Sequence, residues 1–204
     1  MRVECAITHA DQPLGYAIGP ALEAREALQA LTNPTTAPND LIDKALSLAA
    51  ILLKMVKKGD RNLANHLLQS GAAEKKFREI VAAQGGNGKI RPKDIDVEKK
   101  AKRAVVRSTG SGEVGYISNK TLVNIARLAG APKDIFSGIL LRKKLHDAVK
   151  SGEPLYTIYA EKPFKLRQAI SMAKNYSGYE IYTPKRHVVM EKINEDVERQ
   201  RSNA

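Results

Sequence analysis

The sequence has 204 residues, and its 43% hydrophobic content is enough for a packed core in one or two domains. The formal net charge of +12 attracts phosphates and other acidic partners, but 5% aromatic content without tryptophan disfavours a surface that stacks nucleic-acid bases. The apolar run at residues 46–55 is too short to span a bilayer, so we expect no membrane-spanning segment.

The amino terminus and the cysteine content point to one compartment. MRVECAITHADQ has neither the apolar core of a signal peptide nor the Arg and Ser richness of a transit peptide. The single cysteine, Cys5, excludes an internal disulfide, which is typical of a reducing cytoplasm. We therefore predict a cytoplasmic protein, and we expect Cys5 to be a small buried hydrophobic residue and not a nucleophile.

The first predicted element is a loop that runs straight into a helix, in the sequence QPLGYAIGPALEAREAL of residues 12–28. Gly15 and Gly19 permit backbone conformations that other residues avoid, and Pro20 presets the first helical turn. From Ala21 onward nearly every residue is a strong helix former. Such a junction normally follows a core strand, so we expect the chain to start in the middle of a fold.

The next predicted helix covers residues 40–55, after a proline-punctuated loop, with Asp40 as its N-cap. Spacings of three and four residues predict one buried apolar face, made of Leu41, Ala45, Leu48, Leu52 and Met55. Asp60 is expected to cap a third helix, and Ser70 and Gly71 to open a fourth. We expect these helices to cover a sheet whose strands are not in this sequence.

Residues 84–93, QGGNGKIRPK, are predicted to form a flexible turn and linker. GGNGK has the composition of a phosphate-binding loop, but the full Walker spacing and the Ser or Thr after Lys89 are absent.

A second unit of short strands and helices is predicted at residues 95–193. Strands at 104–108 and 113–118 flank TGSG, which is typical of a hairpin turn. Ser118 or Asn119 is expected to cap a helix that ends at Gly130. The remaining predicted elements are a strand at 138–144, a turn at 146–154, a strand at 154–160, a helix at 162–177, a strand at 187–193 and a polar tail at 194–204.

Several blocks of the sequence resemble thymidine, pyrimidine-nucleoside and AMP phosphorylases. PLGYAIGPALEARE is similar to the segment that closes their α/β domain, and GPALEAREAL is nearest to the AMP phosphorylase branch. The resemblance continues through DLIDKALSLAAILLKM, SGAAEKKFREIVAAQGG, IARLAGAPKD and VKSGEPLYTIYAE. It implies an α+β fold: residues 1–84 as the helical remnant of an α/β domain, 85–94 as a linker, and 95–193 as a small α/β-hammerhead or barrel-sandwich-like carboxy-terminal domain.

The resemblance implies phosphorolysis of AMP to adenine and ribose 1,5-bisphosphate, with thymidine or another pyrimidine nucleoside as the alternative substrate. The implied partners are inorganic phosphate and a nucleoside or nucleoside 5′-phosphate, in an intact enzyme that is a homodimer or larger. In this family the phosphate- and base-binding groups lie upstream of the segment that matches QPLG. We therefore expect no catalytic residue in this chain and no activity of the chain alone. A truncated gene product agrees with this expectation, and so does a split enzyme completed by a separate amino-terminal subunit.

One binding site of the family carries over to this sequence. Pyrimidine-nucleoside phosphorylases hold an alkali cation, potassium, with two backbone carbonyls of an LGxA turn and a Glu on the helix that follows. The matching positions are Leu14, Ala17 and Glu26, and oxygen ligands suit a hard cation. The remaining ligands in the family come from a glycine-rich loop that this sequence does not contain. In the other interpretation, which we expect for this chain alone, Glu26 is a solvated helix residue that pairs with a nearby Arg. No further cofactor is implied.

A protein of another class also stays open, namely a stand-alone basic module that binds nucleic acid. Of the 34 Lys and Arg residues, 24 follow residue 84, against 13 of the 22 Asp and Glu residues. Only residues 93–103 and 141–146 form basic clusters, which favours a solvated surface. The four histidines, His9, His66, His146 and His187, have no metal-ligand spacing. His9 lies just before the turn and is expected to be a surface residue.

Overall fold

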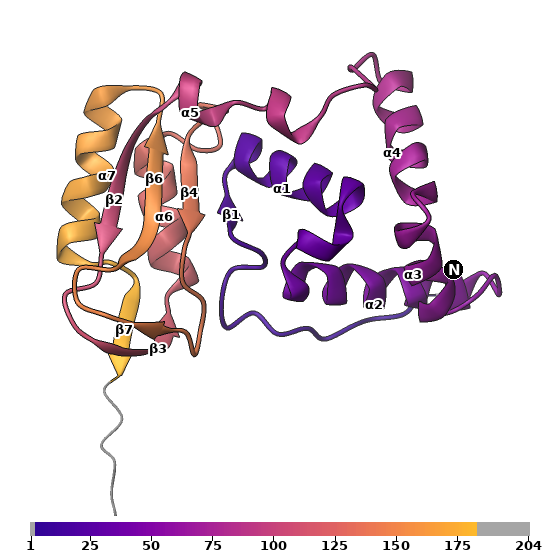
Figure 1. The fold of residues 1–204 in the computed structure, drawn as a ribbon, viewed down its shortest axis with the longest axis horizontal. Helices are drawn as coiled ribbons and strands as arrows, with labels where there is room; N and C mark the ends of the chain where they lie inside the picture. The colour runs from indigo at the N-terminus through magenta and orange to yellow at the C-terminus, as the bar shows by residue number, and fades with distance from the viewer. Residues whose placement is uncertain (1–2, 183–204) are drawn as a thin grey trace, which may run out of the picture.

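The computed structural model describes residues 3–182, which form a helical part and a sheet-containing part side by side (Figure 1). The helical part contains β1 (Ala17–Ile18), α1 (Pro20–Thr32), η1 (Pro34–Thr36), α2 (Asn39–Met55), α3 (Arg61–Gln69) and α4 (Ala72–Ala83). The sheet part contains η2 (Pro92–Asp94), α5 (Val97–Lys100), β2 (Lys102–Arg107), β3 (Gly112–Ile117), α6 (Asn119–Ala129), β4 (Gly138–Leu141), β5 (Ala148–Val149), β6 (Pro154–Ala160), α7 (Pro163–Asn175) and β7 (Tyr179–Tyr182). This mixture confirms the α+β class. Within residues 3–182 no helix is long and apolar enough to cross a bilayer.

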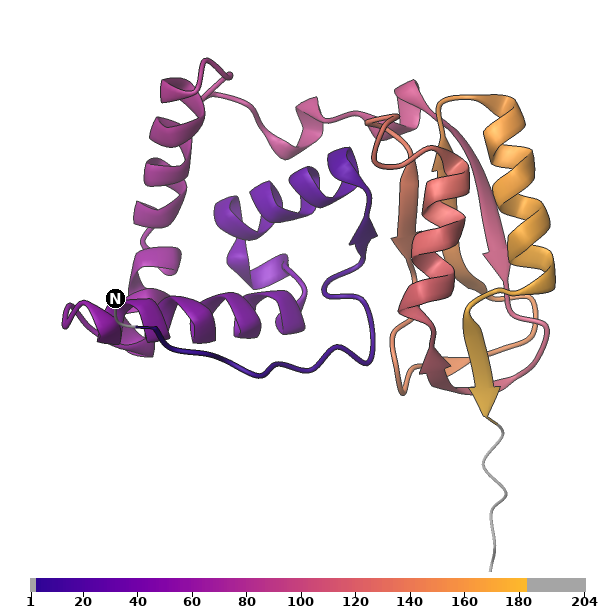
Figure 2. The ribbon, with the colours of Figure 1, turned by 180° about the vertical axis from the view of Figure 1, so that it is seen from behind.

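Two antiparallel sheets form the framework of the sheet part, in the strand orders β1-β4-β6-β2 and β5-β3-β7. Helices α6 and α7 lie side by side over one face of the four-stranded sheet, as Figure 2 shows from behind. Ser118 caps α6 by accepting the N–H of Thr121 at 3.2 Å, and Gly130 follows its last turn, as predicted. The buried side chains of α6, at helical spacing, then join the largest core of the molecule: Leu122, Ile125, Ala126 and Ala129.

The short strand β1 ties the two parts together, because it precedes the helices in sequence but pairs with β4 in space. Gly19 follows β1 with a φ of +122°, and a Cβ there would overlap the carbonyl oxygen of Ser137. A second core fills the space between α1, α5 and the other face of the sheet; it comprises Ala17, Ala21, Leu22, Val97, Ala101 and Tyr159. Helix α1 is therefore packed on the sheet.

Helix α2 packs through a different face from the predicted one. Its inward side chains contact Leu31 of α1 and the buried Ala64 and Leu68 of α3; they are Ile42, Leu46, Ala49 and Leu53. On the predicted face, Leu48 and Leu52 are 42% and 64% exposed. The prediction was wrong because apolar residues surround most of this helix, so their spacing alone does not select the buried face.

Helix α4 has no buried residue, and one side chain, that of Arg78, connects it to the segment that follows. Arg78 donates to Glu74 at 2.8 Å and to the carbonyl oxygens of Gly88 and Ile90, both at 2.9 Å. The segment that leaves α4, predicted to be a flexible turn, is thus hydrogen-bonded to the helix that precedes it.

Three predictions about local chemistry have different outcomes. Asp60 caps α3 as expected, accepting the N–H of Asn62 at 2.8 Å. Asp40 does not cap α2, which begins one residue earlier and after Pro38. Cys5 is exposed, so its predicted burial was wrong. It lies in the segment that runs beside α2 towards β1 (Figure 1), in which residues 3–11 are all exposed.

The predicted hairpin in the sheet part was also wrong. β2 pairs with β6, whereas β3 pairs with β5 and β7, so TGSG connects two different sheets. The predicted turn at 146–154 contains β5, and β7 follows α7 where no strand was expected. A local sequence signal marks a turn but not the strands that pair across it. The strand predicted at 187–193 and the polar tail at 194–204 lie outside the described residues.

Candidate functional site at the QPLG turn

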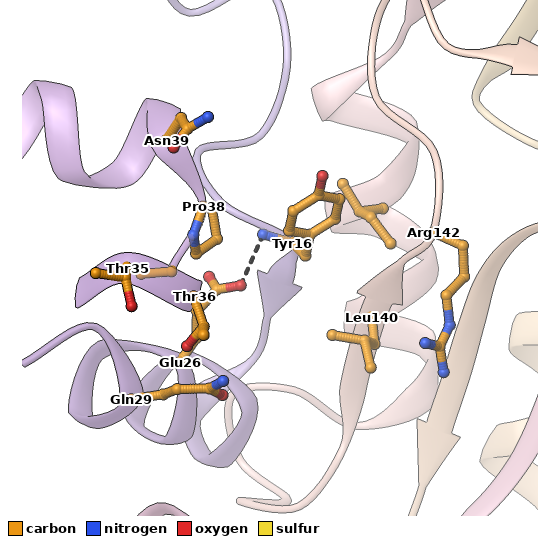
Figure 3. Close-up of a pocket in the computed structure, with 11 residues that line it drawn as sticks. Tyr16, Glu26, Gln29, Thr35, Thr36, Pro38, Asn39, Leu140 and Arg142 are labelled. Carbon is orange, nitrogen blue, oxygen red and sulfur yellow. Dashed lines mark hydrogen bonds between the residues drawn. The ribbon is translucent and has the colours of Figure 1, made fainter. Parts of the chain in front are cut away.

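The chain turns sharply at residues 12–17, and Glu26 of α1 binds the inside of this turn (Figure 3). The Glu26 carboxylate accepts the backbone N–H of Tyr16 at 2.9 Å and that of Ala17 at 3.4 Å. Gly15 has a φ of +63°, and a Cβ at this position would overlap the same carboxylate. Both the backbone conformation and the close approach therefore require glycine at position 15.

A second carboxylate, Asp40, holds the other edge of the turn together with a lysine from the sheet part. Asp40 Oδ2 accepts the N–H of Gly15 at 3.2 Å and the ammonium of Lys144 at 2.9 Å. The same ammonium donates to the carbonyl oxygen of Gly15 at 2.6 Å and to that of Pro13. It also lies 5.4 Å from the centroid of the Tyr16 ring. Residues from the turn, α2 and the loop after β4 thus meet at one ammonium group.

The pKa values of Glu26 and Asp40 are shifted in opposite directions. Burial raises the pKa of Glu26, although the amides of Tyr16 and Ala17 lower it in part. Burial also acts to raise the pKa of Asp40, but the hydrogen bond and charge of Lys144, with the Gly15 amide, outweigh it and hold that pKa below its ordinary value. Lys144 therefore keeps the Asp40 carboxylate, which faces the turn, in its ionised form.

Two of the predicted cation ligands, Ala17 and Glu26, lie next to each other, because the N–H of Ala17 donates to the Glu26 carboxylate at 3.4 Å. The carbonyl oxygen of the preceding residue, Tyr16, accepts the N–H of Leu141 in β4. A carboxylate is a suitable ligand for a hard cation. Leu14 lies between the two residues whose carbonyls bind Lys144. The solvated interpretation of Glu26 was wrong: this carboxylate is half-buried on backbone amides, and Arg25 pairs with Glu98 at 2.7 Å.

A cavity of about 630 Å³ opens beside the turn, between α1, η1 and β4 (Figure 3). Its lining is polar and apolar in nearly equal parts. The polar side chains are Tyr16, Glu26, Gln29, Thr35, Thr36, Asn39 and Arg142. Within residues 3–182 no group of three His, Cys, Asp or Glu side chains is arranged to hold a metal. The cavity therefore offers hydrogen bonds and one guanidinium, without a cluster of acid, base or metal-binding groups.

The described histidines lie away from this cavity. His9 is exposed, and its carbonyl oxygen accepts the ammonium of Lys44 at 2.8 Å. His146 lies 2.9 Å from a carboxylate oxygen of Glu113, also at the surface. The prediction for His9 as a surface residue is confirmed, and His187 is outside the described residues.

Comparison with known proteins identifies the family. Residues 113–180 match the description "Pyrimidine nucleoside phosphorylase C-terminal domain". The chain is 46% identical over 178 residues to a protein named AMP phosphorylase from Methanococcus vannielii, covering 85% of this chain and 35% of the relative. It is 45% identical over 175 residues to AMP phosphorylase 1 of Archaeoglobus fulgidus (85% and 34%) and 43% identical over 183 residues to the AMP phosphorylase of Pyrococcus abyssi (88% and 36%).

The chain belongs to the AMP phosphorylase and pyrimidine-nucleoside phosphorylase family. It corresponds to the carboxy-terminal portion of that family and spans about a third of the length of the curated relatives it matches. The QPLG turn, with Glu26 and Asp40, therefore lies in this carboxy-terminal portion.

Sequence reasoning found Glu26 and Gly15 but missed Asp40 and Lys144 as members of the site. Asp40 had the pattern of a helix cap, and Lys144 stood in the basic cluster LRKKLH, typical of a solvated surface. The two residues are 104 positions apart, and no spacing rule connects them. Only the docking of the loop after β4 on the turn brings them together.

Proposed function

We propose that this chain forms the carboxy-terminal part of an AMP phosphorylase, which converts AMP and inorganic phosphate to adenine and ribose 1,5-bisphosphate. The observation that supports this proposal is the identity of 43–46% with proteins of that name over 85–88% of the chain. A thymidine or pyrimidine-nucleoside substrate is the alternative, supported by the description of the domain at residues 113–180.

In this proposal the chain supplies architecture, and the groups that contact phosphate and base come from the remaining part of the enzyme. The QPLG turn is held by Glu26 on one edge and by Asp40 and Lys144 on the other, so it is a rigid element that a catalytic part can rest against. We propose division into units at residues 1–84 and 95–193 joined by 85–94, an intact enzyme that is a homodimer or larger, and a cytoplasmic location.

An alkali cation, potassium, is part of the proposed intact site. Glu26 and the carbonyls of Leu14 and Ala17 would hold it, and its charge would neutralise Glu26 and fix the turn. Glu26 is suited to this role because it is half-buried and close to the turn.

The test is phosphorolysis with defined components. Purified chain is incubated with AMP or thymidine and inorganic phosphate, and release of the free base is followed by chromatography. We expect no release from the chain alone, and release of adenine once a polypeptide that supplies the rest of a relative's length is added. Preferential release of thymine would favour the pyrimidine alternative. Turnover by the chain alone near the rate of an intact relative would contradict the proposed division of labour.

Nucleic-acid binding is tested on the same preparation. We expect weak retention of single-stranded RNA, because only residues 93–103 and 141–146 concentrate basic side chains. Tight retention whose affinity falls steeply with salt would favour the basic binding module instead.

A further inference from the structure

The Lys144 ammonium is surrounded by oxygen atoms in the manner of a bound ion. An ammonium has three N–H donors, and three acceptors surround it: the carbonyl oxygens of Pro13 and Gly15 and a carboxylate oxygen of Asp40. The face of Tyr16 lies on a further side, 5.4 Å away. Lys144 is only 9% exposed, so this pairing is not an ordinary surface contact.

Hydrogen bonds of the main chain hold the loop around Lys144 in place, one within the loop and one to the turn. The N–H of Lys144 donates to Asp147 at 2.7 Å, and the N–H of Leu145 donates to the side-chain oxygen of Gln12 at 3.0 Å. The loop after β4 therefore contacts residues 12–16 through main chain and side chain together.

These oxygens form the ligand set of a monovalent cation. Two neutral carbonyls, one carboxylate and an aromatic face balance one positive charge, and oxygen ligands are those that a hard cation prefers. We propose that the carbonyls of Pro13 and Gly15 with Asp40 form a monovalent-cation site that the chain fills with its own Lys144 ammonium. The Lys144 site uses the carbonyls of Pro13 and Gly15 with Asp40. It therefore shares no ligand with the proposed potassium site, which uses Glu26 and the carbonyls of Leu14 and Ala17.

Removal of the ammonium has a defined consequence. Lys144→Ala removes every side-chain atom beyond Cβ, that is, three carbons and the ammonium nitrogen. n-Propylammonium has the same three carbons and ammonium group. The carboxylate and carbonyls would remain directed at a space without a positive charge, and a partly buried carboxylate without its partner is costly. Because the Lys144 side chain is 11% exposed, the space has an opening through which a small cation can enter.

The experiment measures hydrogen–deuterium exchange of the peptide that covers residues 12–19, together with the melting temperature. We expect Lys144→Ala to speed exchange of this peptide on the order of tenfold and to lower Tm by about 10 °C. n-Propylammonium chloride should restore most of the protection, whereas tetramethylammonium chloride at equal ionic strength should not. Lys143→Ala is the matched control, since it removes the same charge one residue away, from a pair with Glu153, and should leave this peptide unchanged.

Unchanged exchange in Lys144→Ala, or equal effects of the two salts, would overturn the proposal. Should Lys144→Ala fail to fold by circular dichroism, Asp40→Asn is compared with Asp11→Asn, which alters an exposed carboxylate before the turn. Faster exchange at residues 12–19 in Asp40→Asn alone supports the proposal, and equal exchange in both variants overturns it. The measurements use no phosphorolysis, so their outcome is independent of the proposed reaction.

Discussion

The sheet part and the helical part of this molecule differ in where their apolar side chains lie. In β6 six consecutive residues are buried, and the core around it contains fully buried side chains from α6 and several strands. In the helical part, α4 has no buried residue, and Leu52, Val56 and Ile80 are 64%, 62% and 49% exposed. Most of the buried apolar side chains therefore belong to the sheet part, and we expect that part to carry most of the stability of the described chain.

The largest effect is expected from a cavity in the sheet part. Ile158 on β6 is fully buried, so Ile158→Ala should lower the free energy of unfolding by about 2–5 kcal/mol. Urea denaturation followed by circular dichroism measures the change. Val105→Ala on the neighbouring strand, where the side chain is 43% exposed, is the control and should cost much less. Equal losses in both variants would contradict the assignment of stability to this core.

The next effect is expected at the turn between the two parts. Gly15→Ala introduces a Cβ at a φ of +63° and against the Glu26 carboxylate, so it should destabilise the protein by about 1–3 kcal/mol. Thermal denaturation measures this, with Gly110→Ala as the control, because a Cβ at position 110 meets nothing within 4 Å. If Gly15→Ala left the stability unchanged, the turn would not have the fixed conformation described above.

A smaller effect depends on pH through Asp40. Its pKa in the folded protein lies below the ordinary value of 3.8 because Lys144 outweighs burial. The ionised carboxylate therefore stabilises the fold above pH 3.8, and this contribution is lost as the pH falls through the lower folded pKa. At pH 7 the melting temperature of Asp40→Asn should be lower than that of the parent protein. The difference between the two melting temperatures should become smaller as the pH falls below about 3.8. A difference that stays constant over this range would argue against an ionised Asp40.

The smallest effect is expected on the exposed side of α2. Leu52→Gln should change the free energy of unfolding by no more than about 0.5 kcal/mol, because the side chain is 64% exposed. Leu46→Gln, on the buried side of the same helix, is the matched variant and should cost several times more. If Leu52→Gln were the more damaging change, the face predicted from apolar spacing would be the packed one after all.

The sequence was sufficient for elements whose signals are local. Asp60, Ser118 and Gly130 marked helix ends correctly, because a cap and its amide are three residues apart or fewer. Glu26 was identified through the family resemblance. In contrast, the partners of β2 and β3, the buried face of α2 and the meeting of Asp40 with Lys144 depend on contacts between distant segments. Apolar periodicity and turn composition carry no information about such pairing.

The position of β1 and α1 has a consequence for limited proteolysis. Both elements precede the 85–94 segment in the chain, yet they are packed against β4, α5 and Tyr159 beyond it. A protease that cut at Lys89 would therefore produce two fragments that stay associated, as in a nicked but intact protein. They would elute together from a sizing column under native conditions and separate only after denaturation.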